Sequence, residues 1–268
     1  MVEKQWDNPL AENWKNQVPP ARPSPAECVV FKRFLDEKIR QKGNQTKVLI
    51  LGSTPEFRDL INNAWLTAHC VDYSKENYEA FALLKKMDGV EQFYQQDWTA
   101  MRLPEKFDLI FAEAALNAIS KADAQNVCKS VKEHCAPEGL FIVKNWIRMP
   151  KKSVSLPKIL KTYREQFKGN FKQMTILPLY SFLYDEVENC IALKDIFLSV
   201  KRYFQEGILR REEFASFENL GYETTKHQLF FPLEEEFNDL VAPFFAIKEK
   251  IIPEPIGMNT IPVYVLSP

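Results

Sequence analysis

The stretch that decides the fold is KVLILGSTPEFRDLINNAWLTAHCVDY, residues 47–73. It begins with the continuous apolar run KVLILG (47–52), which ends in a glycine and is typical of a buried parallel strand. EFRDLINNA (56–64) follows with a helical pattern, and LTAHCVDY (66–73) is a second apolar run, which contains Asp72 near its end. A strand, a helix and a second strand in this order predict a right-handed βαβ unit.

The same alternation continues beyond this unit. A helical pattern at 77–87 precedes a weaker strand pattern at 90–97, and a fourth strand is expected over about 107–112. Residues 120–134 form an amphipathic helical pattern, and LFIVKNW (140–146) is typical of a fifth buried strand. The succession predicts an α/β fold with a doubly wound, mostly parallel sheet and helices on both of its faces.

The pattern changes on either side of this core. Residues 1–26 contain the proline-rich segment VPPARPSP and are expected to form an extended N-terminal arm, followed by a single domain over 27–268. Ser24 is predicted to cap the first helix, with Pro25 at its first position. Residues 150–220 have the pattern of helices without a strand between them, and we expect a helical insertion that covers one end of the sheet.

Strand patterns return near the C-terminus. They occur at YETTKHQLFF (222–231) and at IPVYVLSP (261–268), and the segment between them, FNDLVAPFFAIKEKI (237–251), has a helical pattern. We expect the two late strands to complete the sheet.

Composition and charge narrow the function classes. The 268 residues are 46% hydrophobic, enough for a large core, and 35 Lys and Arg against 36 Asp and Glu argue against a protein-wide basic surface for nucleic acid. Residues 144–172 carry nine basic residues and one acid, so a local nucleic-acid-binding patch stays an open alternative.

No apolar run reaches the roughly 18 residues of a membrane span. The polar N-terminus lacks a signal-peptide pattern, so we expect a cytoplasmic protein. Five cysteines without a CxxC pair and three histidines without ligand spacing predict no metal site.

Ligands of such sheets bind beyond the carboxyl ends of the strands, so the residues there are candidates for a functional site. They are Gly52, Ser53, Thr54, Glu56, Asp72, Tyr73, Asp97, Trp98, Glu113 and Asn145. Asp72 follows Gly52 by twenty residues, the spacing at which an acid binds both ribose hydroxyls, although it is also placed to cap a helix. Two roles fit Asp97 and Trp98: they bind an adenine, or Asp97 caps a turn and Trp98 is a packing ring beside it. Glu113 ends an apolar strand, so either a ligand neutralises it or it is an exposed strand-end acid.

From Lys47 to about Trp146 the sequence resembles the class I S-adenosylmethionine-dependent methyltransferases. VLILGSTPEF stands in place of their glycine-rich loop, CVDYS at the ribose-binding strand end and QQDW at the adenine-binding position. FDLIFAEAALNAI corresponds to the strand that bears substrate-side residues, and VCKSVKEHCAPEGLFIV to a helix, a turn and the fifth strand. The RPSP arm ahead of an LGxTPE loop is similar to one bacterial branch of the family. The resemblance implies a Rossmann-like, seven-stranded sheet whose last strand, 261–268, is antiparallel, and S-adenosylmethionine as cofactor.

The loop departs from the family pattern. Ile50 stands where the family has an acid, and Gly52 is the only glycine left in the loop. Pro55 removes one backbone N–H donor. Glu56 is a candidate to replace the missing acid as partner of the cofactor's amino group. The residues that the resemblance assigns to the cofactor are Gly52, Ser53, Thr54, Glu56, Asp72, Tyr73, Asp97, Trp98 and Glu113.

The expected function is methyl transfer to a small-molecule acceptor. Glu113 is the first candidate for acceptor contact or general base, and Asn117 and Asn145 are expected to orient it. Tyr180 and Tyr184 of the insertion are expected to face the pocket. Three arm residues are expected to close over the cofactor, namely Trp14, Arg22 and Ser24.

Three other function classes stay open. A nicotinamide-dependent oxidoreductase needs a GxGxxG turn for the pyrophosphate, which GSTPEF does not provide. An RNA methyltransferase would use the basic stretch 144–172. A non-catalytic cofactor-binding or interaction protein would have kept the fold while losing the glycine-rich loop. The sequence predicts neither the acceptor nor the oligomeric state.

Overall fold

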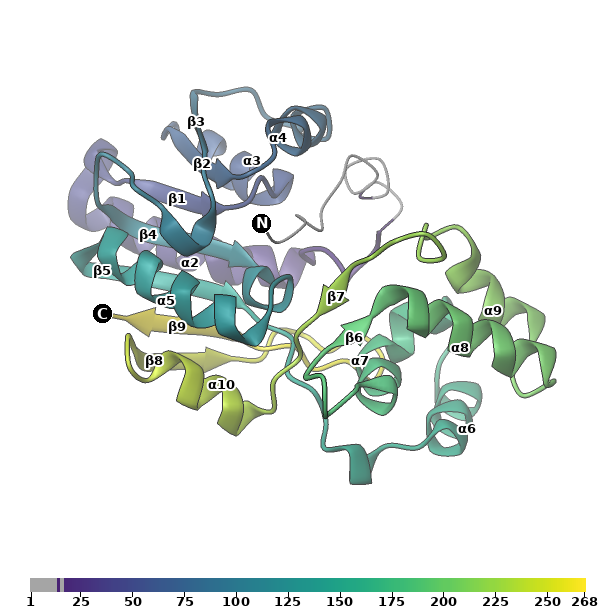
Figure 1. Cartoon of the computed structure of the whole chain (residues 1–268). Coiled ribbons are helices and arrows are strands. Elements are labelled where there is room, and N and C mark those ends of the chain that lie inside the picture. Colours follow the sequence, from purple (N-terminus) through teal and green to yellow (C-terminus); the bar gives the residue numbers. More distant parts are fainter. Residues whose placement is uncertain (1–13, 15–16) are drawn as a thin grey trace.

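The structure is a computed structural model that describes Trp14 and residues 17–268. Its centre is a seven-stranded sheet in the order β3-β2-β1-β4-β5-β9-β8 (Figure 1). The strands are β1 (Val48–Leu51), β2 (Ala68–Asp72), β3 (Glu91–Gln95), β4 (Phe107–Glu113), β5 (Cys135–Lys144), β8 (Ala246–Ile251) and β9 (Val263–Ser267). β1 to β5 are mutually parallel, and β9 runs antiparallel to β5 and to β8. The predicted mostly parallel, Rossmann-like sheet is confirmed.

Helices cover both faces of the sheet. α2 (Pro25–Lys42) and α3 (Pro55–Asn63) bury their apolar side chains on one face, and α5 (Lys121–His134) and α10 (Glu234–Val241) on the other. α4 (Lys75–Ala82) connects β2 to β3. β1 is buried at every position because both faces are covered, which explains why its sequence is a continuous apolar run.

The start of α2 follows the predicted capping chemistry. The Ser24 hydroxyl accepts a hydrogen bond from the Glu27 N–H at 3.1 Å, and the Glu27 carboxylate accepts one from the Ser24 N–H at 2.6 Å. This capping box, with Pro25 at the first helical position, confirms the predicted helix start.

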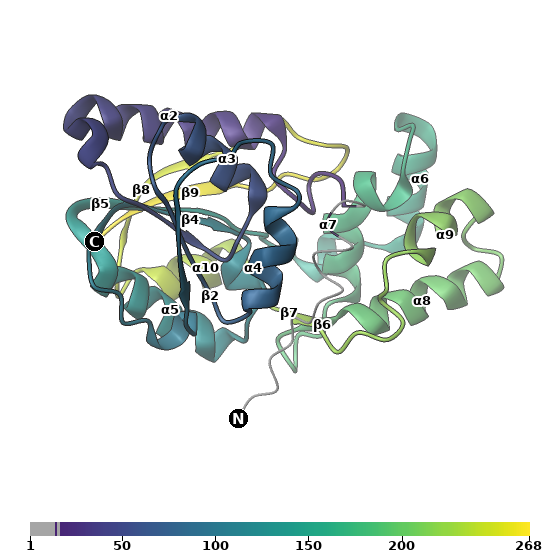
Figure 2. The same ribbon diagram turned by 90° about the horizontal axis from the view of Figure 1, so that it is seen from above.

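Four helices form a separate layer beyond the carboxyl ends of the strands, which we call the cap (Figure 2). They are α6 (Leu156–Gln166), α7 (Phe171–Leu183), α8 (Leu193–Gln205) and α9 (Arg211–Glu218). A two-stranded sheet of β6 (Ile191–Ala192) and β7 (Gln228–Leu229) lies at its base. Short 3-10 turns occur at η1 (Gly43–Gln45), η2 (Trp98–Ala100), η3 (Ala115–Asn117) and η4 (Lys151–Ser153). The cap has its own apolar core, which explains a helical pattern with no strand between the helices.

Two expectations for the C-terminal part are wrong. Residues 222–231 do not join the main sheet, since only Gln228–Leu229 is a strand and it pairs with β6. The segment 237–251 is not one helix, because α10 ends at Val241 and Pro243 has no backbone N–H to continue the helical hydrogen bonds. The rest of that segment forms the exposed edge strand β8.

The helices of the described residues include none that is both long enough and apolar enough to cross a bilayer. The proposed division into an arm, 1–26, and one domain stays a prediction.

Candidate active site

The turn after β1 brings three predicted site residues together. The Gly52 N–H and the Trp98 indole N–H both donate to the carbonyl of Val71, at 2.8 and 2.7 Å. A Cβ at Gly52 would lie 3.5 Å from the Trp98 ring and 3.9 Å from a carboxylate oxygen of Asp72, and the φ angle of +93° itself favours glycine. The one glycine left in this loop is therefore favoured by its backbone angle, whereas a Cβ would find ordinary van der Waals contacts there.

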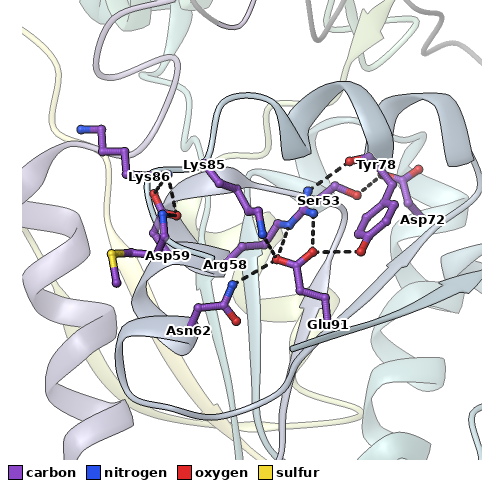
Figure 3. A network of polar contacts seen from close by, with 10 residues as sticks. Ser53, Arg58, Asp59, Asn62, Asp72, Tyr78, Lys85, Lys86 and Glu91 are labelled. Carbon is purple, nitrogen blue, oxygen red and sulfur yellow. Dashed lines mark hydrogen bonds and ion pairs between the residues drawn. The ribbon is translucent and has the colours of Figure 1, made fainter. Parts of the chain in front are cut away.

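Asp72 lies buried at the end of β2. Its Oδ1 accepts a hydrogen bond from the Ser74 N–H at 3.0 Å, and its Oδ2 lies 3.4 Å from the Ser53 hydroxyl (Figure 3). The N-cap of α4 is Ser74, so the alternative role of Asp72 as that cap is wrong. Tyr73 lies between them, and its carbonyl accepts from the Gln95 side chain at 3.1 Å. Asp72 is thus held at the edge next to the β1 turn.

Asp97 and Trp98 make different contacts, although they are neighbours in the sequence. The Asp97 carboxylate is exposed and accepts from the N–H and the hydroxyl of Thr99, at 2.9 and 2.8 Å, which is the geometry of a cap. The Trp98 ring is half-buried and packs against the core beneath the sheet edge. The capping alternative therefore describes the contacts of Asp97, while Trp98 lies beside Gly52.

A buried carboxylate anchors the helix that follows the turn (Figure 3). Glu91 of β3 accepts from Arg58 of α3 at 3.1 Å, from Asn62 at 3.1 Å, from Tyr78 at 2.9 Å and from Lys85 at 2.6 Å. Burial alone would raise the pKa of Glu91, but the hydrogen bonds from Arg58 and Lys85 lower it to about 2. This network joins α3 and α4 to the amino end of β3, whereas Asp72 lies at the carboxyl end of the neighbouring strand β2.

The arm reaches the same region through Arg22. Its guanidinium donates to the Glu56 carboxylate in the first turn of α3, with Nε–Oε1 at 2.8 Å, and lies 5.8 Å from the centroid of the Trp14 ring. The other carboxylate oxygen of Glu56 is buried and has no hydrogen-bond partner among the described residues. Thr54 precedes the helix without a capping hydrogen bond. Arg22 and Trp14 thus lie near the strand ends, and their closure over the cofactor stays a prediction, whereas Ser24 is used as the cap of α2.

The carboxyl end of β5 carries a buried lysine. Lys144 Nζ donates to the Pro20 carbonyl at 2.7 Å, lies 3.0 Å from the nearer carboxylate oxygen of Glu27 and donates to Glu113 Oε1 at 2.9 Å. Its side chain is 0% exposed, and those of Glu27 and Glu113 are each 5% exposed. The reading of Glu113 as an exposed acid is therefore wrong. Sequence reasoning missed Glu27 and the role of Lys144, although a lysine inside the apolar run LFIVKNW is a signal of a buried charge.

Glu113 is electrostatically unusual. Burial raises its pKa to about 8, against the lowering effect of Lys144 and with further raising from Glu27 and Glu56. The pKa of Lys144 is raised by its two carboxylate partners despite its burial, so the lysine stays charged. The second oxygen of Glu113, Oε2, is buried without a hydrogen-bond partner in the described part of the chain. A proton or a donor group is therefore stabilised at this atom.

Asn117 does not orient Glu113 by a direct hydrogen bond. Its amide donates to the carbonyls of Trp146 and Phe230, at 3.0 and 2.8 Å, and accepts from the Trp146 N–H at 2.8 Å. Asn145 is buried and donates to the Trp146 carbonyl at 3.3 Å. Asn117 thus holds distant backbone segments together, whereas the Asn145 side chain bonds only its neighbour and its amide oxygen has no partner among the described residues, so neither makes the predicted contact with Glu113. The reason is that buried backbone groups outside the sheet need partners.

A cavity of about 260 Å³ lies between the carboxyl ends of β4 and β5, the arm and the cap. Aromatic side chains form much of its wall, namely Trp14, Trp146, Tyr180, Tyr222 and Phe231. Glu113 and Asn117 also line it, whereas the predicted cofactor residues at the ends of β1, β2 and β3 do not. Tyr180 faces the cavity as expected. Tyr184 does not, because its ring lies under the Arg148 guanidinium, 4.9 Å from the ring centroid.

Comparison with known proteins gives one family match over part of the chain. Residues 52–143 match a family described as "Methyltransferase domain". The search of curated proteins found no match. Among the described residues, no group of three or more His, Cys, Asp or Glu is placed to hold a metal ion.

Solved structures resemble the chain over nearly its whole length. An S-adenosylmethionine-dependent methyltransferase from Clostridium acetobutylicum has a TM-score of 0.53 at 15% identity, covering 97% of this chain and 98% of the other. The N-methyltransferase NodS from Bradyrhizobium japonicum, in complex with S-adenosylhomocysteine, has a TM-score of 0.52 at 10% identity, covering 98% and 100%. A Rhodobacter sphaeroides protein, named provisionally for zinc-dependent alcohol dehydrogenases, has a TM-score of 0.55 at 14% identity and covers 96% of both chains.

At these identities the solved structures show the fold alone. The matched domain begins at Gly52 and ends in β5, so it spans the turn after β1, Asp72 and Glu113. The domain match covers about a third of the chain, and the solved structures add the shared Rossmann-like fold.

Proposed function

We propose that this protein is an S-adenosylmethionine-dependent methyltransferase that acts on a small-molecule acceptor. The observation that carries the proposal is the pair of buried carboxylate oxygens, on Glu56 in the first turn of α3 and on Glu113 at the end of β4, that lack hydrogen-bond partners among the described residues. The two acids are close enough for Glu56 to raise the pKa of Glu113.

The chemistry of these acids fits the cofactor, which carries an ammonium group and a sulfonium sulfur. Three carboxylates, of Glu27, Glu56 and Glu113, share two cations, Lys144 and Arg22, so the cluster holds one more acid than base. At neutral pH a proton on Glu113, whose pKa is raised to about 8, balances this charge, and a cation bound at the unpaired oxygen of Glu56 would take over that role. Glu56 would therefore hold the amino group of the cofactor, which leaves Oε2 of Glu113 for the acceptor. Asp72 would hold the ribose hydroxyls, and Trp98 would lie beside the adenine.

The protein's own residues have three tasks in the proposed reaction. Lys144 holds one oxygen of Glu113, which leaves Oε2 to accept a proton, and the raised pKa of Glu113 suits proton transfer near neutral pH. Asn117 fixes the segments on two sides of the cavity. The aromatic walls exclude water and align the acceptor. When bound, the cofactor supplies the methyl group and the leaving group.

The basic stretch 144–172 gives little support to an RNA acceptor. Lys144 is buried and forms ion pairs with Glu27 and Glu113, and Arg164 pairs with Glu213 at 2.7 Å. Lys172 is buried and donates to Gln17 at 3.0 Å, and Arg148 is buried beside two glutamates. Because three of the nine basic residues are buried and Arg164 is paired, only the five exposed lysines of the stretch are left for a polyanion, so it is a weaker polyanion surface than its composition indicates.

The test is calorimetric titration of the purified protein with S-adenosylmethionine and S-adenosylhomocysteine, with NADH as the control ligand. We expect micromolar binding of S-adenosylhomocysteine that falls at least tenfold in Asp72→Ala, since one lost charged hydrogen bond is worth about 1.5–3 kcal/mol. Asp36→Ala is the matched control, because Asp36 is an exposed acid of α2 that pairs only with Lys32 in the described structure.

Two results would contradict the proposal. Binding of NADH in preference to both adenosyl ligands would favour the oxidoreductase class. A folded protein that binds neither ligand, alone or with candidate acceptors present, would favour the interaction-protein class.

A further inference from the structure

We propose that the acceptor is the amino nitrogen of a small arylalkylamine, bound in the 260 Å³ cavity with its ring against the aromatic wall and its nitrogen at Glu113 Oε2. This inference rests on the proposed function, because it names the acceptor for the same site.

The charge of the cavity selects against anions. Glu113 is its only acidic lining residue, and no lysine or arginine lines it among the described residues. The other titratable side chains that face it are those of His227, Tyr180 and Tyr222. A carboxylate or phosphate ligand would meet Glu113 with no cation to balance it, whereas an ammonium group would pair with the oxygen that Lys144 leaves unoccupied. The acceptor is therefore a cation or a neutral donor.

The shape of the wall selects a flat apolar group. The Trp146 and Phe231 rings are stacked, with centroids 5.7 Å apart and planes 8° apart, and the Tyr180 ring is stacked on Phe231, with centroids 6.0 Å apart and planes 13° apart. Three nearly parallel rings offer edges and faces for aromatic packing and for cation–π contact. The volume is just below the roughly 300–1,000 Å³ typical of small-molecule sites, which favours a compact ligand.

The proposed reaction involves three groups: the arylalkylammonium, Glu113 and the bound S-adenosylmethionine. The bound arylalkylammonium transfers one proton to Glu113 Oε2, which frees the nitrogen lone pair. That lone pair forms the new N–C bond while the C–S bond of the sulfonium breaks and its electron pair stays on sulfur. The products are a methylated ammonium, neutral S-adenosylhomocysteine and the proton on Glu113, which then leaves to solvent. A raised pKa of Glu113 helps the first step, since the carboxylate must compete for a proton with an amine.

The experiment compares three probes with the same ring and chain: 2-phenylethylamine, 2-phenylethanol and phenylacetate. Binding is measured by tryptophan fluorescence without cofactor, since Trp14 and Trp146 line the cavity, and by formation of S-adenosylhomocysteine with cofactor. We expect the amine to bind at least tenfold more tightly than the alcohol and the acid, and to be the only one methylated.

Variants test the contribution of the Glu113 carboxylate separately from that of the aromatic wall. Glu113→Gln is expected to weaken amine binding at least tenfold and to change alcohol binding less than threefold. It should stay folded, because Lys144 keeps Glu27 and a backbone carbonyl as partners. Phe231→Leu is expected to weaken all probes alike. Tyr184→Phe is the control, because Tyr184 is buried outside the cavity.

The outcomes distinguish this inference from the proposed function. The amine inference is overturned if S-adenosylhomocysteine binds but the alcohol or the acid binds as tightly as the amine. It is also overturned if S-adenosylhomocysteine binds and none of the three probes does. Both results leave the methyltransferase proposal standing. Selective amine binding without any affinity for the adenosyl ligands supports the amine site and contradicts the methyltransferase proposal.

Discussion

The Glu91 network allows the sharpest stability prediction. Glu91→Gln keeps the size of the side chain but removes the charge that faces Lys85 and Arg58, whose side chain is 0% exposed. The pKa of Glu91 falls from 4.5 to about 2 on folding, which corresponds to about 3 kcal/mol of stability at neutral pH. We therefore expect the free energy of unfolding at pH 7 to fall by about 3 kcal/mol, and the melting temperature by roughly 6–12 °C.

The loss of stability in Glu91→Gln should depend on pH, and the direction of that dependence follows from the lowered pKa. Because folding lowers the pKa of Glu91, the stabilisation is present above pH 4.5 and disappears as the pH falls toward 2. Urea unfolding followed by circular dichroism at pH 7, 5, 4 and 3 should show the variant and the natural protein converging at the acid end. Glu79→Gln is the matched control, since Glu79 in α4 is 61% exposed and pairs only with Lys75 in the described structure.

A loss below 1 kcal/mol at pH 7 would refute the reasoning, because it would mean that the buried Arg58 does not need its carboxylate. A loss of about 3 kcal/mol that stays constant down to pH 3 would also refute it. Such a result would assign the effect to packing rather than to charge.

Three further predictions concern other parts of the fold. Lys144→Met leaves two buried carboxylates without their cation and is expected to cost about 3–5 kcal/mol in urea unfolding at pH 7; a loss under 1 kcal/mol would contradict the ion-pair geometry. Ser24→Ala removes the hydroxyl of the capping box and is expected to cost about 1 kcal/mol in the same assay. Gly257→Ala should lower the melting temperature more than Gly43→Ala, although both have φ near +60°, because the new Cβ would lie 2.6 Å from the Met174 carbonyl oxygen whereas nothing lies within 4 Å at Gly43; equal losses would argue against the close contact.

The local elements were largely predictable from the sequence. The apolar run at 47–52, the helical period after Pro25 and the alternation of the two patterns depend on neighbouring residues, since burial on one or both faces repeats with the geometry of the element. The same holds for Asp72, because a strand end twenty residues after Gly52 lies beside it in a parallel βαβ unit. The connection rules then left few ways to order the sheet.

Other features depend on contacts between distant segments. Lys144 and Glu27 are 117 positions apart, and only the packing of α2 and the arm against the end of β5 makes Lys144 a buried ion-pair partner rather than one more residue of a basic stretch. The edge strand β8 lies where its sequence has a helical pattern, because β9 offers hydrogen bonds that the isolated segment lacks.

The cavity is the clearest case of this division. Its walls come from the arm, from β4, from the end of β5 and from the cap, so no spacing in the sequence encodes its volume or the position of Glu113 in its wall. The sequence by itself determined the periodicity of each element and the residues at the strand ends, because these follow from local backbone geometry and burial. The tertiary structure alone decided which of those residues share a buried environment, because burial and charge pairing are set by groups that meet only after the chain has folded.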